Sequence, residues 1–193
     1  MAERPTPTTF TRRGPAWCEV TPLDGGFFRV RVGGLLKTGW KAGLCNRLAE
    51  ARISVDHMHA RVSHDDAWIA ELHLCALEGA PDPMGLPYIE LGEDDDAAPS
   101  TELYLDSYRL IDSRDYGGSL MLTLEGPDKL GLLGSLLASM AELSLYPVEV
   151  HIETHGGRAY DSLWVRAAGG VVPSAAAKQA LESILASSLP ALR

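Results

Sequence analysis

The sequence predicts an α+β protein built from two ferredoxin-like α/β sandwich modules, with antiparallel sheets that carry helices on one face. Three observations lead to this prediction. The chain has 193 residues and is 46% hydrophobic, which is enough for a packed core. One half of the sequence repeats the pattern of the other. Each half also runs through strand, helix and hairpin patterns, an order typical of an antiparallel sheet with helices on one side.

The internal repeat organises the chain. The pair Gly25-Gly26 recurs as Gly117-Gly118, a shift of 92 positions, and this shift needs no gap from Trp17 to about Ser63. Further identities at the same shift are Gly34 with Gly126, Lys37 with Lys129, Gly39 with Gly131, Leu44 with Leu136, and Ala49-Glu50 with Ala141-Glu142. Because these identities fall in the same pattern of turns, strands and helix, we interpret them as a duplication.

Each module is predicted to contain the same elements in the same order. A strand, a Gly-Gly turn that supplies the positive φ of a hairpin, and a second strand come first. A glycine-bearing loop, a helix with an apolar face and a strand hairpin follow. In the first module these elements are Ala16–Leu23, Phe27–Val32, Lys41–Ala51, Val55–Val62 and Asp66–Leu74. In the second they are Tyr108–Ser113, Ser119–Leu124, Leu132–Leu143, Val148–Thr154 and Arg158–Val165, with a last helix over Ser174–Ser187.

The repeat divides the chain into four segments: a flexible tail (1–15), a first module (16–76), a linker (77–107) and a second module (108–190). The tail is polar and lacks the apolar centre of a secretory signal. The linker contains several prolines and the acidic run Glu93–Asp96, which argue against a long helix. We expect one short helical turn there.

The acidic composition excludes several classes of function. The formal net charge is -9, whereas nucleic acids and anionic membranes are bound by basic patches. No stretch approaches the roughly 18 apolar residues of a membrane-spanning helix. Cys18, Cys45 and Cys75 are odd in number and lack C-x-x-C spacing, so we expect free thiols in a reducing compartment. The sequence therefore predicts a cytoplasmic protein that binds neither nucleic acid nor membrane.

The loop before the second module's helix is the main candidate site. It reads Gly126-Pro-Asp-Lys-Leu-Gly-Leu-Leu133 and follows an alternating strand. Backbone N–H groups at a helix start attract anions such as the carboxylate of an amino acid, and Asp128 offers a partner for its ammonium group. The competing interpretation is that Asp128 only caps the helix and Gly131 only permits close packing.

These residues resemble the ACT domain, a small ligand-binding regulatory module of amino-acid metabolism. The resemblance rests on the loop Gly126–Leu133, on Ala141-Glu142-Leu143, on Thr154–Gly157 and on Arg158–Val165. The extra strand Tyr108–Ser113 is similar to one subgroup, the tandem modules of nitrogen-sensing uridylyltransferases and of plant ACT-repeat proteins. Nothing in the chain resembles the catalytic parts of the uridylyltransferases.

The resemblance implies a set of ligand-binding residues. The loop would contribute Asp128, Lys129, Leu130, Gly131, Leu132 and Leu133. The third strand of a neighbouring module would complete the pocket with Tyr146, Pro147 and Val148. The sequence departs from the family at Leu130, where the family has proline, and at Tyr146, where it has asparagine. In the first module Leu36 stands in place of the acid, so that module looks like a degenerate copy that supports the second.

Histidines on the first module's hairpin form a second candidate. His57 and His59 alternate onto one face, and a turn near His64-Asp65 would place His73 opposite His57 and Glu71 opposite His59. Three imidazoles and a carboxylate can bind zinc or nickel. The polar outer face of an antiparallel sheet explains the same pattern, so we expect no metal ion and no cofactor.

Asp161 is predicted to face inward, between Ala159 and Leu163. A buried carboxylate needs a partner, which is either a functional group or a nearby backbone N–H. Catalytic motifs such as G-x-S-x-G, H-E-x-x-H and the P-loop are absent from the sequence.

The sequence leads to one main hypothesis of function, a non-catalytic sensor. It would bind an amino acid or similar small ligand and act on a partner enzyme, as a homodimer or an intramolecular pair of modules. One alternative is a ligand-free scaffold that holds or dimerises a partner enzyme. The other is a metal-dependent enzyme that uses His57, His59 and His73.

Overall fold

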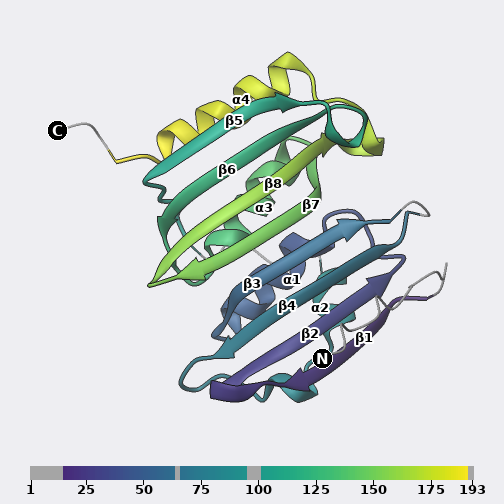
Figure 1. Ribbon diagram of the computed structural model, residues 1–193, viewed down its shortest axis with the longest axis vertical. Coiled ribbons are helices and arrows are strands. Elements are labelled where there is room, and N and C mark those ends of the chain that lie inside the picture. The colour runs from purple at the N-terminus through teal and green to yellow at the C-terminus, as the bar shows by residue number, and fades with distance from the viewer. Residues whose placement is uncertain (1–14, 64–65, 95–100, 191–193) are drawn as a thin grey trace, which may run out of the picture.

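The computed structural model describes residues 15–63, 66–94 and 101–190. Within these residues the chain forms eight β-strands and four α-helices. The strands make one antiparallel sheet, and the helices lie on one face of it (Figure 1). The predicted α+β class with antiparallel strands is therefore confirmed. The tail predicted over 1–15 lies, apart from Pro15, outside the described residues.

The strand order is β1-β2-β4-β3-β7-β8-β6-β5, so the second half repeats the order of the first in reverse. The strands are β1 (Trp17–Pro22), β2 (Phe27–Gly34), β3 (Ile53–Val62), β4 (Trp68–Ala76), β5 (Ser107–Ser113), β6 (Ser119–Pro127), β7 (Leu145–His155) and β8 (Arg158–Ala167). The helices are α1 (Trp40–Glu50), α2 (Tyr88–Glu93), α3 (Leu132–Glu142) and α4 (Ala175–Ser187). Because the order reverses, β3 and β7 meet at the centre of the sheet.

Two strands begin earlier than the sequence pattern predicts. β3 begins at Ile53 and β7 at Leu145, and in both the pairing register shifts, between Val55 and His57 and between Pro147 and Glu149. A β-bulge of this kind adds one residue and breaks the alternation of side chains. The alternating pattern therefore revealed only the part of each strand beyond the bulge.

The pair of β3 and β7, which we call the seam, joins the two halves into one sheet. His59 lies opposite His151 at the middle of the seam, and these residues are related by the 92-residue shift. Arg61 lies opposite Glu149 on one side of them and His57 opposite Glu153 on the other. Equivalent residues therefore meet at the seam, as they do across a two-fold interface.

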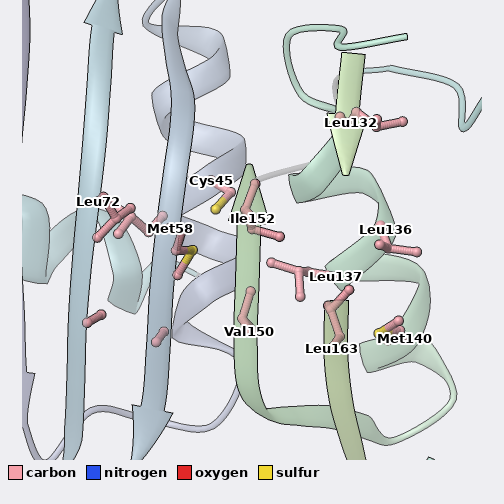
Figure 2. Packing of buried hydrophobic residues seen from close by; sticks show 14 of the residues in the cluster. Cys45, Met58, Leu72, Leu132, Leu136, Leu137, Met140, Val150, Ile152 and Leu163 are labelled. Carbon is pink, nitrogen blue, oxygen red and sulfur yellow. The ribbon is translucent and has the colours of Figure 1, made fainter. Parts of the chain in front are cut away.

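The core under the sheet is one cluster that continues across the seam. Figure 2 shows Met58 on β3 and Ile152 on β7 side by side, with Leu137 of α3 close to β7. Helices α1 and α3 pack against each other beneath this part of the sheet. A Cβ at Gly134 would lie 2.1 Å from Oδ1 of Asn46, so glycine is needed where the two helices approach most closely.

The segment predicted as a linker is packed against the fold over its described residues. Helix α2 packs on α1, and Tyr88 at its start is buried, with its hydroxyl donating to the carbonyl of Pro83 at 2.8 Å. Leu105 is fully buried and its N–H donates to the carbonyl of Ser188 at 2.9 Å. Burial of these side chains anchors the connection between the halves at both ends.

Cys18 is exposed, Cys45 is buried and Cys75 is partly buried, and none of the three is paired in a disulfide in the structure. Among the helices of residues 15–63, 66–94 and 101–190, none is long and apolar enough to cross a membrane.

Candidate functional site

The loop between β6 and α3 is held in a fixed shape by backbone contacts. Gly131 adopts φ 88°, a conformation that suits glycine, and is the N-cap of α3. The N–H of Leu132 donates to the carbonyl of Lys129, and that of Asp128 to the carbonyl of Gly157, both at 2.9 Å. No side chain makes a capping hydrogen bond at this helix start. Asp128 therefore does not serve as the helix cap.

A cavity of about 30 Å³ lies beside this loop, between the two halves of the molecule. The six loop residues predicted from the sequence all contribute to its wall. From the second half its lining is Asp128, Lys129, Leu130, Gly131, Leu132, Leu133, Gly134, Ile152, Thr154, Ala159 and Asp161. From the first half its lining is Cys45, Ala49, Ile53, Ser54 and Val55.

The third-strand residues named by the family resemblance lie away from this cavity. Tyr146, Pro147 and Val148 do not line the cavity beside Asp128. Ile53–Val55 of β3 take that place, because the antiparallel seam brings the first half's third strand to the second half's loop. Tyr146 lies instead at the first half's loop, where its Cε1 is 3.7 Å from the position a Cβ at Gly39 would take.

Asp161 is the most unusual residue of the cavity. It comes from β8, is 3% exposed, and its Oδ1 has no hydrogen-bond partner among the described residues. Burial and the nearby charge of Asp128 raise the pKa of the Asp161 carboxyl to about 7. The predicted inward direction is correct, and the missing partner distinguishes Asp161 from an ordinary hydrogen-bonded core residue.

Asp128 has a milder version of the same environment. Burial raises the pKa of the Asp128 carboxyl, a hydrogen bond with Thr154 works against this shift, and the charge of Asp56 adds to it. Two carboxyl groups therefore share one small cavity. Two like charges at short range disfavour simultaneous ionisation unless a cation or a proton lies between them.

Cys45 contributes a thiol to the wall but not a nucleophile. Burial is the main cause that raises its pKa to about 12, with Asp161 adding to the shift and Lys41 opposing it. Because the thiolate is the reactive form of cysteine, Cys45 stays an unreactive apolar side chain near neutral pH.

The strand register shows that the first half places different residues at the equivalent position. Gly34 pairs with Trp68 where Gly126 pairs with Ala159. Two pairs further along, Val32 meets Ala70 where Leu124 meets Asp161. The acid is therefore replaced by alanine and the small Ala159 by tryptophan.

Lys41 adds a buried amine to this first-half position. Its side chain is buried, and its Nζ lies 3.4 Å from the ring centroid of Trp68 and 5.3 Å from that of Trp40. Burial lowers the pKa of Lys41 well below its usual value. A cation above an aromatic face is a recognised stabilising contact. The first half thus fills with its own side chains the position that the second half leaves open.

The predicted strand register of the histidines is confirmed, but a different set of side chains lies close enough together to share a metal ion. His57 faces His73, and His59 faces Glu71, as predicted. Among the described residues, however, the groups close enough to share a metal ion are His59, Glu149 and His151. His57 and His73 stay outside this group, because the seam places β7 against the other side of β3. The pairing across the seam cannot be read from the hairpin pattern alone.

Comparison with protein-family models gives no match, and comparison with curated proteins gives none either. Among solved structures the chain is similar to aspartate kinase from Synechocystis, with a TM-score of 0.49 and 14% sequence identity. The similarity covers 83% of this chain and 27% of that one. This likeness is too distant to assign a family, an activity or a ligand.

Proposed function

We propose that this protein is a non-catalytic regulatory module of two ACT-like, ferredoxin-like halves that binds an amino acid or a similar ammonium-bearing molecule beside α3. The observation that carries the proposal is the pair of carboxyl groups, Asp128 and Asp161, that line one cavity. The unpaired Oδ1 of Asp161 is the atom that most needs a donor.

The chemistry of the site matches the two charged ends of an amino acid. An ammonium group between Asp128 and Asp161 would satisfy the unpaired oxygen and relieve the repulsion between the two carboxyl groups. The start of α3, where no side chain caps the helix, offers backbone N–H groups and the positive end of the dipole to a carboxylate. Thr154 holds Asp128 in place through a hydrogen bond.

Regulation would follow from the size of the cavity. About 30 Å³ accommodates one or two water molecules, so an amino acid enters only after the loop or the seam shifts. A ligand that binds only the opened arrangement shifts the population towards it. Since Ile53–Val55 and the loop belong to different halves, this opening changes how the halves pack, and a partner protein can recognise the change.

The test is a melting-temperature series with each of the twenty amino acids at millimolar concentration. A ligand at 100 times its dissociation constant stabilises the folded state by about 2.7 kcal/mol. For a chain of this size that corresponds to a rise of roughly 5–10 °C. Asp128→Asn and Asp161→Asn should abolish the rise, and Asp112→Asn, which changes an exposed acid paired with Lys178, should leave it intact.

A response that survives both site substitutions would place the ligand elsewhere and contradict the proposal.

The small cavity favours a second candidate, a ligand-free scaffold that holds a partner enzyme. This candidate predicts that no amino acid raises the melting temperature and that Asp161→Asn raises stability above pH 7 with no other consequence. A ligand response of the unmodified protein would exclude it.

A further inference from the structure

The face of the sheet opposite the helices carries a second cluster of polar groups at the seam. We propose that His59, Glu149 and His151 bind a divalent transition metal ion of the zinc class. The site uses one ligand from the first half and two from the second, and it does not depend on the amino-acid site proposed above.

The ligand atoms already lie close to the required spacing. Nε2 of His59 is 3.8 Å and Nε2 of His151 is 2.6 Å from Oε1 of Glu149, and the three atoms all lie within 4.8 Å of one another. Tetrahedral zinc with bonds of about 2.0–2.1 Å separates its ligand atoms by about 3.3 Å. The His151–Glu149 contact must therefore open by about 0.7 Å and the others must close slightly, which side-chain rotation alone can supply.

The unbound cluster leaves one of its nitrogens unsatisfied. Nε2 of His59 is buried and has no hydrogen-bond partner among the described residues, although the side chain as a whole is 43% exposed. The imidazole rings of His59 and His151 stack with centroids 4.4 Å apart, and the ring of Trp164 lies 5.5 Å beyond His151. A metal ion would accept the electron pair of this unpaired nitrogen. An ordinary polar residue on a solvent-facing sheet needs no such partner, because water can supply its hydrogen bonds.

The backbone fixes the positions of these residues. His59 and His151 lie opposite each other in the antiparallel register, and Glu149 lies two residues before His151 on the same face of β7. Ligands on paired strands are held more rigidly than ligands on loops, which favours binding because less freedom is lost.

The donor set selects the class of metal. Two imidazoles and one carboxylate suit zinc, cobalt, nickel and copper ions, whereas magnesium and calcium prefer oxygen ligands only. Three protein ligands leave a fourth position open. His151 also lines a hollow of about 620 Å³ on this face, together with Trp164 and Tyr160, so the fourth position is open to water or to a small anion.

The experiment is calorimetric titration of the full-length, metal-stripped chain with zinc chloride, with cobalt absorption as a second readout of coordination. We expect one ion per chain, visible tetrahedral cobalt bands and no binding of magnesium. Loss of a residue that only hydrogen-bonds to a metal ligand weakens metal affinity about 10–100-fold, so loss of a ligand, as in His59→Ala or His151→Ala, should weaken zinc binding by about 100-fold or more. Glu149→Gln should weaken it as well.

Two matched variants make the test specific. His155→Ala removes an exposed histidine of the same strand, and Cys18→Ser removes an exposed thiol; both should bind zinc as the unmodified chain does. Absence of one-to-one zinc binding would overturn the proposal. So would binding that survives His59→Ala but is lost in His73→Ala, because the hairpin cluster of His57, His73 and Glu71 would then be the site. Circular dichroism of each variant excludes unfolding as the cause of a loss.

Discussion

The loops before α1 and α3 share a backbone conformation but have different side chains beside them. Gly39 and Gly131 both take left-handed conformations, with φ 84° and 88°, as the N-caps of their helices. Beside α1 the space is filled by Trp68 and the ammonium group of Lys41. Beside α3 it is left as a small cavity with two carboxyl groups. The duplicated framework keeps its turn and helix geometry while the side chains that enter it change.

The comparison shows how a binding position is closed without loss of the fold. The first half carries a built-in cation over an aromatic ring, which occupies its own interior. The second half carries two acids at the equivalent position, Asp128 and Asp161, beside a small cavity. One half then serves as a wall for the other, because Ile53–Val55 complete the cavity at the α3 loop.

The largest expected effect of the difference between the two halves is on how the free energy of unfolding changes with pH, compared between the unmodified protein and Asp161→Asn. A folded-state pKa of about 7, raised from 3.8 by burial, means that the folded chain binds the proton more tightly than the unfolded chain. Asp161 therefore supports stability below about pH 4, and this support is lost as pH rises through about 7. Relative to Asp161→Asn, the unmodified protein should lose up to about 4 kcal/mol between pH 4 and pH 8, measured by urea unfolding. A constant difference across that range would contradict the burial of an unpaired acid.

The next largest effect is expected from Trp68→Ala, which would open the filled half. Removal of the ring leaves a cavity and deprives Lys41 of its aromatic partner, so the free energy of unfolding should fall by about 3 kcal/mol. Trp164→Ala, on the open face of the sheet, is the control and should cost about 1 kcal/mol or less. Equal losses in the two variants would mean that Trp68 does not fill an interior position.

Lys41→Met removes the buried cation and keeps much of its volume. Burial lowers the pKa of Lys41, so its ammonium form opposes folding below the lowered pKa, and stability recovers as pH rises from there towards about 10.4. Replacement of a buried charge by an apolar side chain of similar volume is often stabilising, so we expect a gain of about 1–2 kcal/mol at pH 7. Guanidinium unfolding at pH 7 and pH 9 checks both the gain and its decrease at higher pH. A loss of stability would show that the contact with Trp68 outweighs desolvation.

The smallest expected effect tests whether the loops before α1 and α3 share the same backbone conformation. Gly39→Ala and Gly131→Ala each place a Cβ on a residue with positive φ, which costs about 1 kcal/mol through strain. The two losses in thermal stability should be equal within about 0.5 kcal/mol, a tolerance set by ordinary surface effects. A much larger loss for one of them would show that the two loops are not equivalent in the folded chain.

The local pattern of the sequence predicted most of the helices and strands and the register of the β3–β4 hairpin. The alternation of His57 and His59 with apolar residues placed them opposite His73 and Glu71, because hairpin pairing is a local property. The inward direction of Asp161 followed from the same period of two.

What the sequence did not predict depends on contacts between the halves. Nothing in the pattern of β3 or β7 reveals that His59 meets His151, so the sequence did not predict the cluster with Glu149. For the same reason it did not predict that Ile53–Val55, rather than Tyr146–Val148, lie beside the α3 loop. The bulges after Val55 and Pro147 hid the starts of both strands. The content of the first loop was missed because Lys41 looks like an ordinary exposed lysine until Trp68 is seen to cover it.

The seam also sets the order in which the molecule can assemble. The strands β3 and β4 pair across a short turn, whereas His59 and His151 meet only after a long segment has closed into a loop. Closing a long loop is entropically costly and slows the contacts that depend on it. The cavity at Asp128 and the histidine cluster both draw on the two halves, so we expect both to be completed last during folding.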